Sequence, residues 1–339
     1  MIKHIDVVLG CSYGDEGKGK VVHDLLSKHK YNLCIRFNGS GNAGHTIYLN
    51  DQKVVLHQIP IGILHSNVIN VISSDCLVNI AKLQEELECI KNIGVNTHNR
   101  LFISKGCHII TQDAIEYDRR HNTIGTTNSG IGPTYANKML RSGKRVEDYE
   151  KELNELGVQL IDMRKFWFSD LVKDVETVLL EGAQGFELDI NWTNHYPYCT
   201  SSTCTLAGAI NTGIPINKLR NIYGISKMYD TYVGTRPFQP ENDKHLNLIG
   251  TVGKEFGSTT GRKRQCNYLN LDNLIEALKL NQCNICIINK VDIIQEVKVY
   301  KLYHFGVLLQ FESLDNMKTY ISKALEFVDV IYSSNPYNI

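Results

Sequence analysis

The sequence predicts an α/β protein in which one large domain (residues 1–339) is built on a central, mostly parallel β-sheet flanked by helices, with ligand-binding loops inserted between these elements. Short apolar runs such as 5–9 and 285–288 are typical of buried strands. Segments such as 83–90 and 271–278 carry apolar residues at helical spacing. Strands that alternate with helices indicate a parallel sheet covered on both faces. Because no repeat or proline-rich linker divides the chain, a single domain is the simplest organisation.

The N-terminal elements follow the order strand, loop, helix. The run 5–9 predicts a buried strand, and four glycines follow between Gly10 and Gly19. Apolar residues at helical spacing resume at Val21. The glycine-rich loop is therefore predicted to lie between the end of a strand and the start of a helix.

The later elements have recognisable ends. The helix over 83–90 is predicted to end near Gly94, which is suited to a C-cap. The helix over 271–278 is predicted to begin after Asn270 as its N-cap, and a strand follows it closely. The polar stretch 237–247 is predicted to be a surface excursion and not a domain boundary.

Composition sets limits on partners and location. The 36 basic and 36 acidic residues balance, so no overall field draws the chain onto nucleic acid or an anionic membrane. The apolar run 5–9 is too short for a signal peptide, and no stretch approaches the roughly 20 apolar residues of a membrane span. These observations predict a cytoplasmic protein.

The ten cysteines are scattered at irregular spacing through a large chain, which predicts reduced thiols. One Cys-x-x-Cys pair, Cys283 and Cys286, lies in an apolar, strand-like run. Residues three apart point to opposite faces of a strand, so this pair is not expected to bind a metal.

The loop 10–20 carries a signal for phosphate binding. Glycines let backbone N–H groups approach phosphate oxygens, the helix N-terminus adds partial positive charge, and Lys18 supplies a full charge. The loop is not a strict Walker A motif, because its glycine spacing differs and no Ser or Thr follows the lysine. A glycine-rich turn without a ligand therefore stays an alternative. A carboxylate at Asp15 is costly beside a phosphate unless it binds Mg²⁺ or moves a proton.

Further loops carry polar groups suited to a ligand. Within 38–46, His45 lies among small residues that expose hydrogen-bond donors, although a lone histidine is more often structural. The glycine-rich segment 124–133 has hydroxyls that suit either a phosphate or turns. Segments 181–185 and 196–202 add polar groups, with helix caps and turns as the alternative.

Two segments point to particular ligands. In 258–264, three cations follow hydroxyls and a glycine, and the arginine fork matches a carboxylate, so this loop is suited to a dicarboxylic amino acid. A solvated basic turn is the alternative. The segment 289–292, Asn-Lys-Val-Asp, matches the Asn-Lys-x-Asp pattern that reads guanine, and it follows a predicted strand, where ligands gather in open α/β sheets.

Taken together and in this order, these segments resemble the adenylosuccinate synthetase family over nearly the whole chain. The matching stretches are 14–20, 42–46, 124–127, 181–185 and 259–262. The resemblance implies a P-loop NTPase-like α/β fold and a homodimer. The chain is shorter than common bacterial members, which resembles archaeal-type or phage members.

The resemblance implies a role for each matching residue. Asp15 removes the purine N1 proton and binds Mg²⁺ together with the Gly44 carbonyl, and His45 and Lys18 act on the phosphoryl group. GTP binding is implied for Gly14, Glu16, Gly17, Gly19, Lys20, Gly44, Thr46, Arg264, Lys290, Asp292 and Ser333. Nucleotide-substrate binding is implied for Asn42, Thr127, Gln184, Thr200, Arg262 and, reaching from a second subunit, Arg141. L-Aspartate binding is implied for Thr259, Thr260, Arg262 and Arg264.

The implied reaction explains why these residue types are needed. A purine 6-oxo group cannot leave as oxide, so GTP first phosphorylates it, and the aspartate amine then displaces phosphate at carbon 6. The products from IMP are adenylosuccinate, GDP and phosphate. Deprotonation of N1 makes the 6-oxygen nucleophilic, and cationic and N–H donors with Mg²⁺ stabilise the phosphoryl-transfer transition state.

Several positions depart from the family pattern. They are Cys11-Ser12-Tyr13, Ser40-Gly41, Tyr232, Arg236, Lys263, Gln265 and Asn335. These departures concern the recognition of the base and of aspartate, whereas the matching acid and histidine are present.

Two alternatives to IMP ligation follow from the same residues. One is the same chemistry on GMP or dGMP, which the short chain and Cys204 favour and the presence of Asp15 disfavours. The other is a guanine-nucleotide switch without ligase activity, which would not need the arginine-rich segment. The sequence does not decide between GTP and ATP as the donor.

Overall fold

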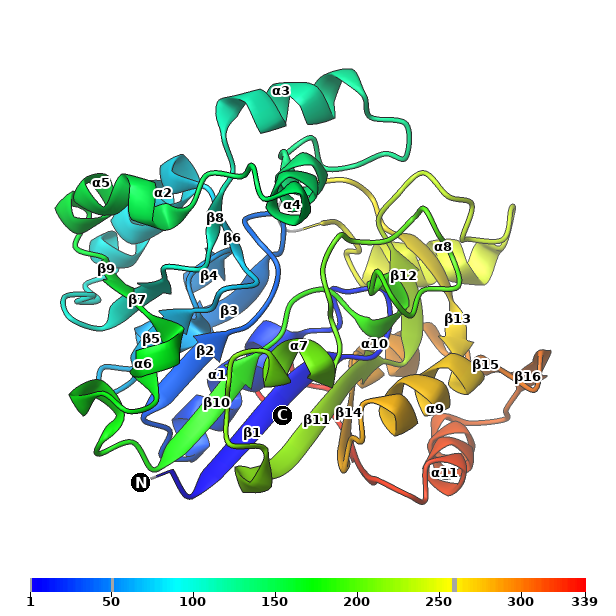
Figure 1. The fold of residues 1–339 in the computed structure, drawn as a ribbon. Coiled ribbons are helices and arrows are strands. Elements are labelled where there is room, and N and C mark those ends of the chain that lie inside the picture. Colours follow the sequence, from blue (N-terminus) through cyan, green and yellow to red (C-terminus); the bar gives the residue numbers. More distant parts are fainter. Residues whose placement is uncertain (1, 50–51, 258–260) are drawn as a thin grey trace.

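The computed structural model describes residues 2–49, 52–257 and 261–339, and it places them around one large parallel sheet (Figure 1). Its strand order is β17-β14-β11-β1-β10-β2-β5-β7-β9, and every neighbouring pair is parallel. The strands are β1 (His4–Gly10), β2 (Leu33–Arg36), β5 (Ile69–Ile72), β7 (Leu101–Ser104), β9 (Gln159–Ile161), β10 (Thr177–Glu181), β11 (Leu219–Lys227), β14 (Ile285–Asn289) and β17 (Asp329–Tyr332).

Helices cover the sheet and carry its connections. They are α1 (Lys18–Lys28), α2 (Ile80–Asn92), α3 (Gln112–Arg120), α4 (Ile131–Leu140), α5 (Glu150–Glu155), α6 (Met163–Phe166), α7 (Leu206–Ile210), α8 (Lys244–Val252), α9 (Leu271–Leu280), α10 (Val291–Val297) and α11 (Leu314–Ala324). Helices α3 and α4 pack on each other and lie together at the top of the view in Figure 1. The predicted α/β class with a mostly parallel central sheet is confirmed.

Smaller sheets extend from this framework. A second sheet has the order β12-β13-β15-β16, in which β13 and β15 are parallel and the other pairs are antiparallel. Two short pairs join β3 to β4 and β6 to β8. Their bounds are β3 (His45–Leu49), β4 (Gln52–Leu56), β6 (Leu77–Val78), β8 (His108–Ile109), β12 (Tyr229–Tyr232), β13 (Gln265–Asn270), β15 (Lys301–His304) and β16 (Val307–Gln310).

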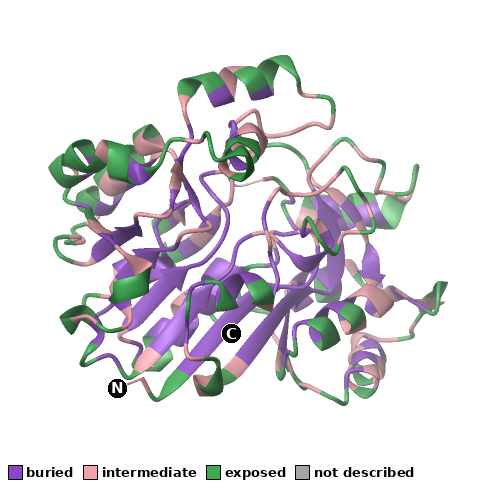
Figure 2. Cartoon of the chain, viewed as in Figure 1, coloured by how far each residue is buried: buried purple, intermediate pink, exposed green. Residues whose placement is uncertain are grey.

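The central strands are buried on both faces, as the continuous apolar runs predict. In β1, Ile5 and Val7 belong to one hydrophobic cluster and Val8 to the cluster on the opposite face, because successive side chains of a strand alternate. In Figure 2 the sheet is purple, whereas the outer sides of the helices and many loops are green. Two hydrophobic layers therefore hold the middle of the sheet rigid.

Most predicted boundaries agree with the structure, but the start of α8 was not predicted. Asn270 caps α9 by accepting a hydrogen bond from the Asn273 N–H at 3.2 Å, and Gly94 follows α2 with φ +79°. The stretch 237–247 is not a loop throughout. Its last four residues begin α8, because Asp243 accepts hydrogen bonds from two N–H groups of the first turn, at 2.9 and 3.1 Å.

The state of the cysteines and the lengths of the helices bear on two further predictions. All ten cysteines are free thiols, and Cys283 precedes β14, whereas the predicted run had both members of the Cys-x-x-Cys pair in a strand. Across the described ranges, no helix combines the length and the apolar character that crossing a membrane requires.

Candidate active site

Polar residues collect at one edge of the large sheet. Arg36 ends β2, Glu181 ends β10, Lys227 ends β11 and Asn289 ends β14, and the loop after Gly10 begins at the end of β1. These strands are parallel, so their carboxyl ends lie on the same side. Ligands of open α/β sheets bind in the crevice outside these ends.

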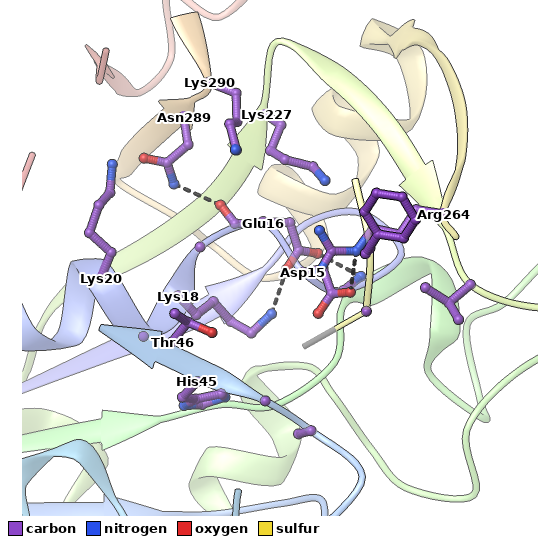
Figure 3. A pocket seen from close by; sticks show the side chains of 18 of the residues that line it. Asp15, Glu16, Lys18, Lys20, His45, Thr46, Lys227, Arg264, Asn289 and Lys290 are labelled. Atoms are coloured by element: carbon purple, nitrogen blue, oxygen red, sulfur yellow. Dashed lines mark hydrogen bonds and ion pairs between the residues drawn. The ribbon is translucent and has the colours of Figure 1, made fainter. Parts of the chain in front are cut away.

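A cavity of about 410 Å³ opens at this edge, and Figure 3 shows many of the side chains that line it. Sixteen of the predicted site residues line the cavity: Gly14, Asp15, Glu16, Gly17, Lys18, Gly19, Lys20, Asn42, Gly44, His45, Thr46, Thr127, Gln184, Arg264, Lys290 and Asp292. Four others are described but are not among the lining residues: Arg141, Thr200, Arg262 and Ser333. Thr259 and Thr260 lie outside the described residues.

The loop between β1 and α1 has the conformation of an anion site. Gly14, Asp15 and Gly17 adopt positive φ angles of 83°, 58° and 93°. Helix α1 begins after Gly17 without a side-chain cap. Its first N–H groups and the helix dipole are therefore directed at the cavity, where a phosphate group would satisfy them.

Glu16 shapes this loop from inside. Its carboxylate is buried and accepts hydrogen bonds from the N–H groups of Gly14 at 2.9 Å and Ser12 at 3.2 Å. The other oxygen pairs with the Lys18 ammonium at 2.5 Å (Figure 3). This ion pair fixes the position of Lys18 beside the loop.

The loop after β10 packs against the phosphate loop at van der Waals distance. A Cβ on Gly185 would lie 2.3 Å from the Ser12 carbonyl oxygen and 2.4 Å from Glu16 Oε1. A Cβ on Gly10 would lie 2.4 Å from the Gln184 carbonyl oxygen. Glycine is required at both positions because no side chain fits between the two loops.

Asp15 belongs to a line of alternating charges. Arg264 donates from Nε to Asp15 Oδ2 at 2.7 Å and from Nη1 to Glu255 Oε2 at 2.6 Å. Glu255 also lies 3.8 Å from the ammonium of Lys227, and both of these side chains are buried. Burial opposes ionisation of Glu255, but Lys227 and Arg264 outweigh it and lower its pKa to about 2. The line keeps Arg264 oriented toward Asp15, as Figure 3 shows.

His45 is buried in a second charged group beneath the cavity. Its Nδ1 pairs with Glu181 Oε1, and Arg36 donates to the same oxygen at 2.8 Å. The pKa of His45 is lowered to about 4, mainly by burial and then by Arg36. At neutral pH the imidazole is therefore uncharged, and its orientation is set by Glu181.

The opposite wall carries amide and hydroxyl groups. Gln184 donates to Asn42 Oδ1 at 3.4 Å, and its own Oε1 is buried without a hydrogen-bond partner in the described chain. Thr127 lies on the same cavity. Arg262 reaches the neighbouring loop and donates to the carbonyls of Gly125 and Thr126 at 3.0 and 3.1 Å. The free Oε1 of Gln184 is suited to a ligand donor.

Two residues predicted to bind the nucleotide substrate, Thr200 and Arg141, do not line the cavity. Thr200 donates its N–H to the Leu188 carbonyl at 2.8 Å, behind the lining residues. Arg141 ends α4 in the left-handed conformation and is exposed. Within one chain, Arg141 does not line the cavity.

The end of the cavity near β14 carries the Asn-Lys-Val-Asp segment. Asn289 donates to the Glu16 carbonyl at 2.7 Å and so ties the phosphate loop to this segment. Lys20 donates to Ser333 Oγ at 2.7 Å and to the Asn335 carbonyl at 2.8 Å. Lys290 and Asp292 complete this end of the cavity. The segment is therefore placed where a base attached to loop-bound phosphates could lie.

Sequence reasoning did not single out Arg36, Lys227 and Glu255. No motif marks them, but Arg36 and Lys227 are charged residues that end apolar strands, and this is a usable signal at the carboxyl edge of a parallel sheet. Glu255 gives no such signal, because it lies between α8 and the undescribed residues 258–260. The contact between Glu255 and Arg264 is seen only in the three-dimensional structure.

The protein atoms alone do not form a metal cage. Across residues 2–49, 52–257 and 261–339, no three His, Cys, Asp or Glu side chains are grouped so that they could hold an ion. The cavity does offer the carboxylate of Asp15 and the backbone of Gly44. One or two protein oxygens with substrate phosphates are the usual ligands of Mg²⁺, so this donor set fits that ion.

Comparison with known proteins gives a consistent result. A family model described as adenylosuccinate synthetase matches residues 7–171 and 149–336. The adenylosuccinate synthetase of Cytophaga hutchinsonii is 37% identical over an alignment of 351 residues, gaps included. This alignment covers 89% of this chain and 81% of that protein. That of Bacteroides fragilis is 37% identical over 340 residues, covering 88% and 80%.

Solved structures agree with the sequence comparison. The fully ligated adenylosuccinate synthetase of Plasmodium falciparum superposes with a TM-score of 0.85 at 27% identity, covering 98% of both chains. The succinoaminodeoxyadenylate synthetase of cyanophage S-2L, bound to dGMP and dATP, gives a TM-score of 0.79 at 20% identity, covering 99% and 94%. The latter likeness concerns the fold.

Proposed function

Because this chain belongs to the adenylosuccinate synthetase family, we propose that it is the GTP-dependent ligase that joins L-aspartate to carbon 6 of IMP, yielding adenylosuccinate, GDP and phosphate. The observation that carries the proposal is the meeting of three groups in one cavity. The phosphate loop, the Asp15–Arg264 pair and the Gln184–Asn42 wall all line it. A nucleotide switch without ligase activity needs only the first of these groups.

The first step is the transfer of the GTP γ-phosphoryl group to the 6-oxygen of IMP. Asp15 accepts the proton of purine N1, and the electrons of that bond increase the nucleophilicity of the 6-oxygen. Lys18 and the N–H groups at the start of α1 stabilise the negative charge of the transferring group. GDP leaves, and the 6-oxygen is now a phosphate ester.

His45 acts on the same phosphoryl group. Its Nδ1 pairs with Glu181, and Arg36 Nη1 lies 2.9 Å from Nδ1 and 3.0 Å from Nε2. An anionic phosphoryl group nearby opposes the burial and the Arg36 charge that lower the His45 pKa, and it thereby favours the protonated imidazole. We propose that His45 then donates a hydrogen bond to the transferring group.

The second step replaces the phosphate by aspartate. Arg264 and Arg262, with Thr259 and Thr260, bind the carboxylates of the amino acid. The amine attacks carbon 6, the carbon–oxygen bond to the phosphate breaks, and the amine loses a proton. Arg264 is suited to this role because its guanidinium already lies beside Asp15, next to the phosphate loop.

The proposed metal and assembly complete the site. Asp15 and the Gly44 carbonyl would hold Mg²⁺, which supplies charge neutralisation of the triphosphate when bound. Arg141 is exposed and lies outside its own cavity, which supports a homodimer in which it reaches the IMP phosphate of the partner subunit. The proposed location is the cytoplasm.

Release of phosphate in the presence of aspartate tests the function. IMP, GMP and dGMP are offered in parallel, each with GTP and with ATP. We expect turnover with GTP and IMP and none when aspartate is left out. Turnover with dGMP and none with IMP would show that the acceptor is a 2-aminopurine nucleotide. Equal GTP hydrolysis without aspartate and acceptor would contradict the ligase.

A further inference from the structure

Four positions at which the sequence departs from the family pattern meet in space. They are Tyr13, Tyr232, Arg236 and Gln265, which come from three separate segments of the chain. The guanidinium carbon of Arg236 lies 5.7 Å from the ring centre of Tyr13, 4.9 Å from that of Tyr232 and 5.5 Å from that of Phe238. We call Tyr13, Tyr232, Arg236 and Phe238 the arginine–aromatic cluster.

The rings of this cluster also contact one another. The ring centres of Tyr13 and Phe238 are 4.9 Å apart at an interplanar angle of 70°, and those of Tyr13 and Tyr232 are 6.0 Å apart at 78°. Both are edge-to-face arrangements, which aromatic pairs favour. Tyr13 is therefore held on more than one side.

Arg236 is bound to the cluster by its charge. Its Nε and Nη2 atoms are buried and have no hydrogen-bond partner among the residues that the structure describes. Three aromatic rings have their centres within 6 Å of the guanidinium carbon, and the negative face of a ring attracts a cation. The attraction is strongest where water is excluded, as it is around these two nitrogens.

Gln265 fixes the loop that carries Arg236 and Phe238. Its Oε1 accepts hydrogen bonds from the N–H groups of Phe238 at 2.9 Å and Gln239 at 3.2 Å. Its Nε2 donates to the carbonyls of Gly234 at 3.0 Å and Arg236 at 2.8 Å. One side chain thus makes four hydrogen bonds to the backbone of four residues within the segment 234–239, and these bonds fix the backbone that carries Arg236.

Tyr13 is the member of the cluster that reaches the cavity. It lines the cavity, and its neighbour Gly14 is close to the Gln184 wall, since a Cβ there would lie 3.6 Å from Gln184 Cα and 3.8 Å from Leu188 Cδ1. The Tyr13 hydroxyl is 3.2 Å from His195 Nε2. Lys290 and Asp292 belong to the other end of the cavity. Tyr13 therefore belongs to the compartment of the acceptor nucleotide and not to that of the GTP base.

We propose that Arg236 is a positioning residue that fixes the Tyr13 ring as a wall of the acceptor compartment, against which the planar purine of the acceptor nucleotide packs. This inference rests on the proposed function, which assigns the Gln184 side of the cavity to the acceptor. Loss of Arg236 removes one of the contacts that fix the Tyr13 ring and weakens acceptor binding, whereas the phosphate loop and the GTP base site keep their shape.

Steady-state kinetics of three variants test the proposal. Arg236→Met keeps the length of the side chain and removes the charge, and Arg236→Lys keeps the charge with a smaller head. The matched control is Lys279→Met, which removes a cation 5.0 Å from the Phe327 ring, outside the cavity. We expect Arg236→Met to raise the KM for IMP about tenfold, with kcat and the KM for GTP changed less than about twofold. Arg236→Lys should lie between wild type and Arg236→Met, and the control should equal wild type.

A double-mutant cycle separates positioning from general damage. If Arg236 acts through Tyr13, then Arg236→Met adds nothing to the KM for IMP once Tyr13→Leu is present. Additive effects of the two changes, an unchanged KM for IMP, or equal rises in the KM values for GTP and IMP would overturn the inference. The wild-type enzyme is assayed first, before any variant is compared. If it releases no phosphate in the presence of IMP, the proposed function itself is overturned.

Discussion

The carboxylate of Asp15 has two neighbours that decide its chemistry: the phosphate loop, which would bring a triphosphate, and Arg264, which donates to it at 2.7 Å. The ion pair with the arginine fixes the position of the carboxylate beside the phosphate loop. Because Glu255 holds the other side of the same guanidinium, the orientation of Arg264 does not depend on Asp15 alone.

The change Asp15→Asn tests this role. The amide keeps the size of the side chain but cannot accept the N1 proton as a base, so we expect the rate of phosphate release to fall by about 10²- to 10³-fold. The control is Asp174→Asn, an exposed residue away from the cavity, which should keep the wild-type rate. A variant at Asp15 that retains more than about a tenth of the rate, with an intact fold by circular dichroism, would remove this residue from the mechanism.

Lys20 gives a prediction for the pH dependence of GTP binding. Burial lowers the pKa of Lys20 to about 8, although Asp292 opposes this effect. The side chain is therefore charged below about pH 8 and loses its attraction for a nucleotide anion as the pH rises further. We expect the affinity for GTP to fall up to about tenfold between pH 7 and pH 9.5, measured by calorimetry.

The variant Lys20→Arg supplies the comparison. A guanidinium keeps its charge throughout this range, so the fall in GTP affinity should be absent or much smaller. The same slope in both proteins would assign the pH dependence to another group.

At the residue scale, sequence motifs identified residues that meet in one place, since sixteen of the predicted residues line one cavity. Motifs could not identify the residues that orient these groups. Glu255 and Arg36 act on Arg264 and His45 through contacts between segments far apart in the chain. Such contacts depend on the tertiary fold and leave no local pattern in the sequence.

Among the elements, the loops after β1 and β10 depend most closely on each other. Gly185 has φ −152°, a conformation open to any residue, so glycine is needed there only for space. The nearest atoms, Ser12 O and Glu16 Oε1, belong to the phosphate loop itself. Any side chain at this position must displace that loop.

We therefore expect Gly185→Ala to weaken GTP binding. Overpacking of this kind raises the free energy of the packed conformation by about 1–3 kcal/mol. If the loop conformation that binds GTP carries this cost, the affinity for GTP falls by about 5- to 150-fold. The matched control is Gly132→Ala in α4, where the nearest atom to a Cβ is Ser201 Oγ at 3.7 Å, an ordinary contact. Wild-type GTP affinity in Gly185→Ala, measured by calorimetry, would show that the two loops move independently.

The elements with a strong apolar pattern were predicted well, because burial on both faces of a parallel sheet fixes a continuous apolar run. The strands around 5–9 and 285–288 and the helix after Asn270 lie where the sequence indicates. The start of α8 was missed because polar residues precede its apolar face, and the cap at Asp243 was not recognised. The small sheet β12-β13-β15-β16 was not predicted, since its strands are short and their partners are distant in sequence.

For the whole molecule, the exposed position of Arg141 leads to a prediction about assembly. In the proposed homodimer, each site takes Arg141 from the partner subunit, so Arg141→Ala and Asp15→Asn damage the same site from different chains. We expect each variant alone to have little activity. After the two are mixed and subunits exchange, up to about a quarter of the wild-type activity should return, because half of the dimers then hold one intact site.

Mixing also has a clear negative outcome. If Arg141 served its own chain, the mixture would be no more active than the sum of its parts. A measurement of mass by light scattering shows whether the variants still form dimers, so that loss of assembly is not mistaken for lack of complementation.

The central claim is that the 6-oxygen of the purine becomes the oxygen of a phosphate ester and then leaves with the phosphate. IMP labelled with ¹⁸O at carbon 6, incubated with GTP, Mg²⁺ and L-aspartate, tests it directly by mass spectrometry of the released phosphate. The account predicts one ¹⁸O atom in each phosphate and none in adenylosuccinate. Unlabelled phosphate, with the label retained in the nucleotide or lost to water, would contradict it.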